Sequence, residues 1–197
     1  MVNDKRKTFV ARDDLLNGMS EIAKGKGKSL YETVNETFEA AISLFKIGTT
    51  PKSALEECGR LKSAKDSGYI LCLENLWYDI NTLAYNKAAS ETVAAWRSAG
   101  IWYAKKHTTS GTKDPLQSIK KDLQSSLWNV SEFSMIEDRG EVSVRLLGPR
   151  LSKICSELFL AFFEGIFEVL GYEVREKEVM AGRVNLIALM KEGRSMG

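Results

Sequence analysis

Two alternating segments enclose one strongly apolar stretch near the C-terminal end, and this order restricts the fold more than any other feature. The apolar stretch, residues 151–170, contains LFLAFFEGIFEVL and is followed by Gly171, a residue that commonly ends helices. The segment before it turns at Asp138-Arg139-Gly140, and the segment after it turns at Met180-Ala181-Gly182. Because strands repeat every two residues and helices every 3.6, the pattern predicts two antiparallel hairpins flanking a buried helix.

The central part of the chain is predicted to be helical. GTTPKS (residues 48–53) is the clearest linker before it, since it combines glycine, proline and short polar residues. We therefore expect one module at residues 1–48 and an α+β domain at residues 49–197, in which a helical half precedes the two hairpins. The helices expected in that half span residues 51–65, 67–85, 88–106 and 116–128.

The first 48 residues follow the order short strand, helix, glycine turn, helix. KRKTFVARDD alternates in part, and apolar residues then recur at helical spacing until the glycines of AKGKGKS (residues 23–29). Ser29 is followed by Glu32, which is the capping-box pattern at the start of a helix. The sequence thus predicts a β-α-α unit.

The same AKGKGKS stretch ends like a nucleotide-binding P-loop, with Gly27-Lys28-Ser29. A P-loop needs an earlier glycine where this chain has Ile22, and it needs a buried strand before the loop where this chain has an amphipathic helix. The sequence therefore argues against an NTPase.

A β-α-α unit this small cannot bury a sufficient core alone, so we expect a second copy to complete it. Two strands paired antiparallel would form a ribbon of the width of the DNA major groove. On RKTFVAR, LLNGMSEIAKGKGKS and LYETVNETFEAAI, residues 5–48 resemble the ribbon-helix-helix repressors of the MetJ/Arc/CopG group. The resemblance implies an intertwined homodimer that binds double-stranded DNA.

The resemblance also assigns roles to individual residues. Base reading falls to the outward face of the strand, at Arg6, Thr8 and Val10. A register shift of one residue would turn these side chains inward and the expected core side chains outward. Phosphate binding falls to the start of the second helix, where free amides and positive potential attract anions. The phosphate-binding residues expected are Lys24, Lys26, Lys28, Ser29 and Leu30.

Charge and composition are consistent with this assignment. The net charge of the 197 residues is +2, but residues 1–28 hold seven Lys or Arg against four acids, a local balance of +3. Three scattered cysteines fit a reducing cytoplasm, and no segment resembles a signal peptide or a membrane span. The single histidine, His107, is expected to be exposed and idle, and we expect no metal and no cofactor.

The chain from residue 95 onward resembles, in layout, the 4-vinyl-reductase-type small-ligand domains, which are related to haem-nitric-oxide-binding proteins. The likeness rests on AWRSAGIWYAKK and on FFEGIFEVLGYEVREKEVMAGRVNLIAL. No cysteine accompanies the last hairpin, which argues against a metal site of the kind found in such domains. Four aromatic residues, with ordinary core packing as the alternative, are candidates for an effector pocket: Trp77, Trp96, Trp102 and Trp128.

These features favour a homodimeric transcriptional regulator with a C-terminal sensing or oligomerisation domain, and not an enzyme. Three alternatives remain open. The N-terminal unit could be a simple cap on the larger domain with solvated lysines; the chain could be an antitoxin whose C-terminal part binds a toxin; or it could be a small-ligand protein whose N-terminus only dimerises.

Overall fold

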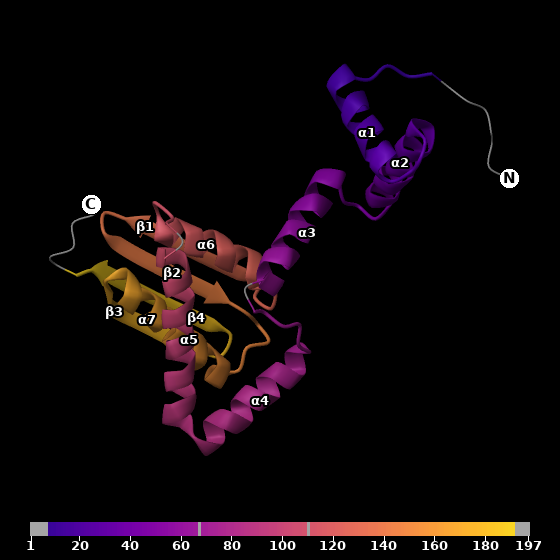
Figure 1. Cartoon of the computed structure of the whole chain (residues 1–197). Helices are drawn as coiled ribbons and strands as arrows, with labels where there is room; N and C mark the ends of the chain where they lie inside the picture. The colour runs from indigo at the N-terminus through magenta and orange to yellow at the C-terminus, as the bar shows by residue number, and fades with distance from the viewer. Residues whose placement is uncertain (1–7, 67, 110, 192–197) are drawn as a thin grey trace. The chain divides into compact units, whose positions relative to one another are not determined.

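The computed structural model describes residues 8–66, 68–109 and 111–191. The chain divides into two compact units, Met1–Gly68 (unit 1) and Tyr69–Gly197 (unit 2), and each is described by itself (Figure 1). The predicted linker at residues 48–53 lies inside unit 1, where it includes part of the connection between the second and third helices and the first three residues of the third helix.

The described part of unit 1 contains three helices: α1 (Asp13–Gly25), α2 (Leu30–Lys46) and α3 (Pro51–Asp66). The turn between α1 and α2 requires a glycine, because Gly27 has φ +65°, which side chains disfavour. Lys28 N–H then donates to Ala23 O at 2.9 Å, which closes the end of α1. Helices α1 and α2 begin and end close to the positions that the sequence indicates.

Within the described residues, the predicted N-terminal strand is not present before α1, so the fold class inferred for this part of the chain is wrong. Residues 8–12 have no regular secondary structure before α1 begins, and the earlier part of the expected strand lies outside the described residues. A strand requires hydrogen-bonded neighbours, and unit 1 offers no second strand within the described residues to pair with residues 8–12. Over the residues that the structure describes, the chain is mostly helical, with one sheet toward its C-terminal end.

The helical half of unit 2 contains α4 (Glu74–Lys87), α5 (Ala89–Thr109) and α6 (Pro115–Ser126). The expected helix at residues 67–85 begins later than predicted: residues 69–73 are not helical, and Gly68 has φ +81°. The buried helix is α7 (Lys153–Leu170), whose start is capped by the Ser152 hydroxyl and whose end is at Gly171.

Both hairpins form where the alternating pattern predicts them. The strands β1 (Glu132–Asp138), β2 (Glu141–Leu147), β3 (Tyr172–Met180) and β4 (Arg183–Met190) make one antiparallel sheet in the order β1-β2-β4-β3. The two hairpins meet through β2 and β4, with Val144 opposite Leu186. One face of the sheet is buried, as the alternating burial along β2 shows.

Helix α7 packs on the buried face of the sheet, and α5 crosses α7 (Figure 1). The two helices approach closely at a pair of glycines: a Cβ on Gly100 would lie 2.0 Å from Phe162 O, and a Cβ on Gly165 would lie 2.1 Å from Arg97 O. Helix α6 contributes Leu116, Ile119 and Leu123 to the same core. Among the described helices, none is long and apolar enough to cross a membrane.

Candidate functional site

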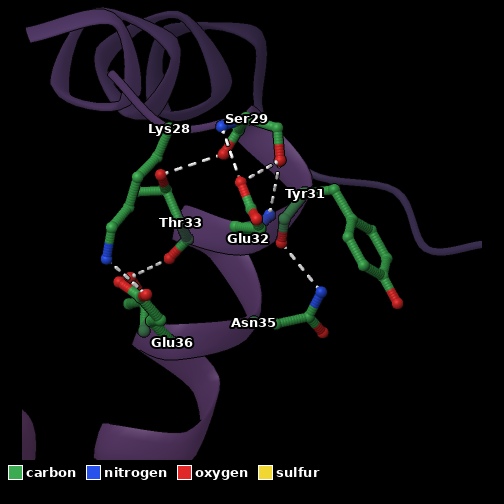
Figure 2. A network of polar contacts seen from close by, with 8 residues as sticks. Lys28, Ser29, Tyr31, Glu32, Thr33, Asn35 and Glu36 are labelled. Carbon is green, nitrogen blue, oxygen red and sulfur yellow. Dashed lines mark hydrogen bonds and ion pairs between the residues drawn. The ribbon is translucent and has the colours of Figure 1, made fainter. Parts of the chain in front are cut away.

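The predicted phosphate site at the start of α2 is occupied by the chain's own capping box (Figure 2). Glu32 N–H donates to Ser29 Oγ at 3.2 Å, and Glu32 Oε2 accepts from Ser29 N–H at 2.9 Å and from the Ser29 hydroxyl at 2.8 Å. The Ser29 backbone N–H, followed by its hydroxyl, holds the pKa of Glu32 below its ordinary value. A phosphate at this helix start would therefore compete with a carboxylate that is ionised at neutral pH.

The lysines beside this capping box differ in their surroundings. Lys28 forms an ion pair with Glu36, one turn further along α2 than Glu32 (Figure 2). Lys24 and Lys26, by contrast, lie at the end of α1 with exposed side chains. Leu30, the remaining member of the predicted phosphate set, is 38% exposed as the first residue of α2. The turn thus presents positive charge mainly through Lys24 and Lys26.

The predicted base-reading residues are only partly described. Thr8 is exposed and Val10 is 99% exposed, so both side chains are accessible, although neither lies on a strand. Arg6 lies outside the described residues. Next to this segment, Phe9 contacts Phe38 of α2 edge-to-face at 5.3 Å between ring centroids.

Unit 1 leaves most of its apolar residues uncovered. Among its described residues, Ala23 is the only buried hydrophobic side chain, and Thr33 is the only buried polar one. One stripe runs along α2 through Phe38, Ile42 and Phe45, which are 46%, 52% and 60% exposed. An exposed apolar stripe of this kind marks a contact surface and not a core.

The four tryptophans predicted as an effector pocket do not come together. Trp77 and Trp96 are neighbours, with ring centroids 5.9 Å apart, and Trp96 also packs edge-on against Phe159. Trp102 and Trp128 are 57% and 60% exposed. The pocket is therefore reduced to one pair of rings at the edge of the core.

Sequence reasoning missed a buried polar network around His107, which it expected to be exposed. His107 is only 7% exposed, and its Nδ1 lies 2.9 Å from Ser118 Oγ and its Nε2 3.2 Å from Asp122 Oδ2. Tyr103 donates its hydroxyl to the same Asp122 oxygen at 2.8 Å, and Lys106 Nζ lies 3.8 Å from it. The available signal was spacing: Tyr103 with His107, and Ser118 with Asp122, are pairs one turn apart on adjacent helices.

Three side chains of this network have the residue types of a Ser-His-Asp triad, but the geometry is that of a clamp between α5 and α6. Ser118 lies inside α6, where its N–H donates to Asp114 O, so this amide is not available to an oxyanion. Burial lowers the pKa of His107, while the Asp122 carboxylate opposes that effect. Burial also raises the pKa of Tyr103 far above its ordinary value. The network therefore holds the uncharged rings of Tyr103 and His107 against the carboxylate of Asp122.

We predict that His107 makes unit 2 less stable in acid. Because the folded pKa of His107 lies below its unfolded value of about 6.5, the unfolded chain binds more protons as the pH falls through that value. The free energy of unfolding should therefore decrease between pH 7.5 and pH 5.5, as measured by urea denaturation followed by tryptophan fluorescence. His107→Gln should flatten this dependence, because the chain has no other histidine; equal slopes for both proteins would contradict the prediction.

Two acidic residues one turn apart on α7, Glu164 and Glu168, have the spacing of a carboxylate pair but bind different partners. Glu164 binds Lys177 at 3.2 Å and Glu168 binds Arg97 at 2.8 Å. Cys155 is buried, as its place in the apolar helix predicts. In the part of the chain that the structure describes, no group of three or more His, Cys, Asp or Glu side chains could hold a metal ion.

Comparison with known proteins adds no family to these observations. No protein-family model, curated protein or solved structure matches the chain. The functional inference therefore depends on the residues themselves.

Proposed function

We propose that the protein is a homodimeric DNA-binding regulator, in which unit 1 dimerises and contacts DNA while unit 2 provides sensing or oligomerisation. The observation that carries the proposal is the uncovered apolar stripe of α2 in a unit that also presents exposed lysines at the α1–α2 turn. The strand ribbon expected from sequence is not part of this proposal.

Dimerisation follows from the energetics of unit 1. With Ala23 as the only buried hydrophobic side chain among its described residues, the unit has too little core to remain folded alone. Phe38, Ile42 and Phe45 recur at the spacing of a helix–helix contact, so α2 of a second copy could cover them. Self-association would repeat one contact twice, as isologous dimers do.

DNA is the partner that the charges of unit 1 favour. Residues 1–28 carry a balance of +3, and the exposed Lys24 and Lys26 would be repeated in both copies of a dimer. Lysines attract the DNA backbone independently of sequence, with an affinity that falls as salt rises. Sequence preference would come from residues before α1, where Arg6 and Thr8 remain the predicted readers.

The proposal also places the protein in the cytoplasm. Cys58 and Cys72 are exposed free thiols, which fits a reducing compartment. An effector of unit 2, if one exists, would act as a switch only by binding the DNA-competent and incompetent arrangements with different affinity.

Binding to random-sequence duplex DNA tests the phosphate contacts. Lys24→Gln with Lys26→Gln should weaken binding and reduce the slope of log affinity against log salt by up to about 0.9 for each lost contact. The measurement is fluorescence anisotropy between 50 and 200 mM salt. Lys62→Gln with Lys65→Gln removes the same charge from exposed positions on α3 and should change the affinity and the slope less.

Two further variants test the dimer and the readers. Ile42→Glu should weaken or abolish the dimer formed through α2 and lower the affinity for DNA with it.

Arg6→Ala with Thr8→Ala should reduce the preference for a selected sequence over random DNA, by about tenfold or more if a bidentate base contact is lost. Undetectable DNA binding by the wild type at low salt would overturn the proposed function.

A further inference from the structure

Helix α4 is held on unit 2 mainly by hydrogen bonds and ring contacts, and not by buried aliphatic side chains. Every residue of α4 is described, and only Asn81 among them is buried. Its leucine and isoleucine side chains are all exposed: Leu76, Ile80 and Leu83. Helix α6 of the same unit instead buries three aliphatic side chains: Leu116, Ile119 and Leu123. Because burying an aliphatic side chain stabilises more than exchanging a hydrogen bond with water, α4 is the more weakly attached helix.

The C-terminal half of α4 reaches α5 and α7 through polar groups. Tyr85 donates to Glu157 Oε2 of α7 at 2.7 Å. Asn81 accepts from Trp96 Nε1 of α5 at 2.9 Å. A single residue outside the helical region, Ala88 with φ −153° and ψ 70°, separates α4 from α5, and the chain turns back there (Figure 1). Rotation at this residue can move α4 as one piece.

The first turn of α4 is attached by the same kind of contact. Tyr78 accepts from Asn129 Nδ2 at 3.0 Å and donates to Glu74 Oε1 at 2.7 Å. Glu74 also forms an ion pair with Arg150 at 2.8 Å, but the Arg150 side chain is 71% exposed, so solvent screens this pair. Residues 69–73, which precede α4, are in neither a helix nor a strand. Neither end of α4 therefore continues directly into another helix or strand.

The apolar surface beneath α4 belongs to α5 and α7. Trp96 of α5 contacts both Trp77 of α4 and Phe159 of α7, with ring centroids 5.9 Å and 5.3 Å apart. Cys155, one turn before Phe159 on α7, is 3% exposed. Burial is the main cause that raises the pKa of Tyr78 to about 12, and the nearby Cys155 thiol adds to it. Cys155 is thus a neighbour of the side chain through which α4 meets the core.

We propose that α4 is a strap that detaches as one piece while the sheet, α5, α6 and α7 stay folded, and that its opening uncovers Trp96, Phe159 and Cys155. Elements held by few buried apolar contacts are the ones that open locally. The core survives the opening because α4 contributes no buried apolar side chain to it. Opening gives unit 2 the two arrangements that any sensing domain needs. All the contacts concerned lie within unit 2, so the strap does not depend on DNA binding by unit 1.

The reactivity of Cys155 measures this opening in the full chain. In a Cys58→Ser, Cys72→Ser background Cys155 is the only thiol, and its reaction with dithionitrobenzoate is followed at low urea concentrations. The rate should exceed the rate that global unfolding permits and should hardly change with urea below the unfolding transition, because detaching one helix exposes little surface. A rate no faster than global unfolding permits overturns the proposal.

Two isosteric substitutions test whether the tyrosine contacts hold the strap. Tyr78→Phe with Tyr85→Phe keeps both rings and removes their hydroxyls, which should raise the labelling rate about tenfold. Ile119→Val, which lowers global stability at a fully buried position of α6, is the control and should leave the rate unchanged. If Ile119→Val speeds labelling in proportion to its loss of global stability, Cys155 reacts only through global unfolding and the strap does not exist.

Hydrogen exchange of the wild-type protein gives an independent measurement. In peptides analysed by mass spectrometry, the amides of α4 should exchange together and at least tenfold faster than those of α6, which its buried side chains hold in place. Amides of α4 as strongly protected as those of α6 would overturn the proposal, even if Cys155 were labelled.

Discussion

Replacing Gly100 by alanine is expected to lower the free energy of unfolding of unit 2 by about 3 kcal/mol. The new Cβ would lie 2.0 Å from Phe162 O and 3.2 Å from Ile166 N, both backbone atoms of α7. No side-chain rotation relieves such a contact, so α5 and α7 would have to separate. The helix propensity gained from alanine, about 1 kcal/mol, offsets only part of this loss. Chemical denaturation followed by far-UV circular dichroism measures the change.

Gly165→Ala provides an independent test of the same crossing, because its Cβ would lie 2.1 Å from Arg97 O. Gly59→Ala is the matched control: it lies inside α3 with nothing within 4 Å of the added Cβ, and it should stabilise slightly. A Gly100→Ala protein as stable as the wild type would show that the two helices do not cross at these glycines.

Truncating Phe163 to alanine is expected to destabilise unit 2 by about 3–5 kcal/mol. Phe163 is fully buried on α7, where its ring stacks on Phe133 of β1 with centroids 6.0 Å apart and meets Phe162 edge-on. Removing the ring leaves a cavity between the helix and the sheet, which rigid strands cannot fill by collapse. The midpoint of urea unfolding should fall accordingly.

Ile136→Ala tests whether this loss depends on burial. Ile136 lies on β1 beside the core but is 57% exposed, so its truncation should cost about 1 kcal/mol or less. Similar losses for Phe163→Ala and Ile136→Ala would mean that α7 does not pack on the sheet as described.

Local sequence patterns were sufficient to predict much of the secondary structure of unit 2. The turns at Arg139-Gly140 and Ala181-Gly182 and the apolar run before Gly171 specify two hairpins and a helix without any knowledge of distant contacts. The capping box at Ser29 and Glu32 was equally local, because its partners are three residues apart. Such features depend on backbone conformation and short-range hydrogen bonds, which neighbouring residues determine.

The N-terminal strand shows where prediction from local sequence patterns failed. Alternation around Thr8 and Val10 favours an extended chain, but strand pairing needs a neighbour that no local pattern can supply. The predicted phosphate site shows a different limit: the capping box of Ser29 and Glu32 was visible in the sequence, but the ion pair of Lys28 with Glu36 became visible only in the folded turn. The four tryptophans similarly lie on or beside helices that the sequence predicts, but the helix assignment does not say which rings meet.

The sequence by itself determined the order of helices and hairpins, the buried α7 and the basic character of the first 28 residues, because periodicity, turn residues and charge are properties of adjacent positions. The tertiary structure decided which faces are covered. It buried His107 against Asp122 and brought Gly100 onto the backbone of α7. It also left Leu76, Ile80 and Leu83 of α4 exposed, while Tyr85 of the same helix is hydrogen-bonded to Glu157 of α7. These outcomes depend on residues that are distant in the chain and meet only when the helices pack.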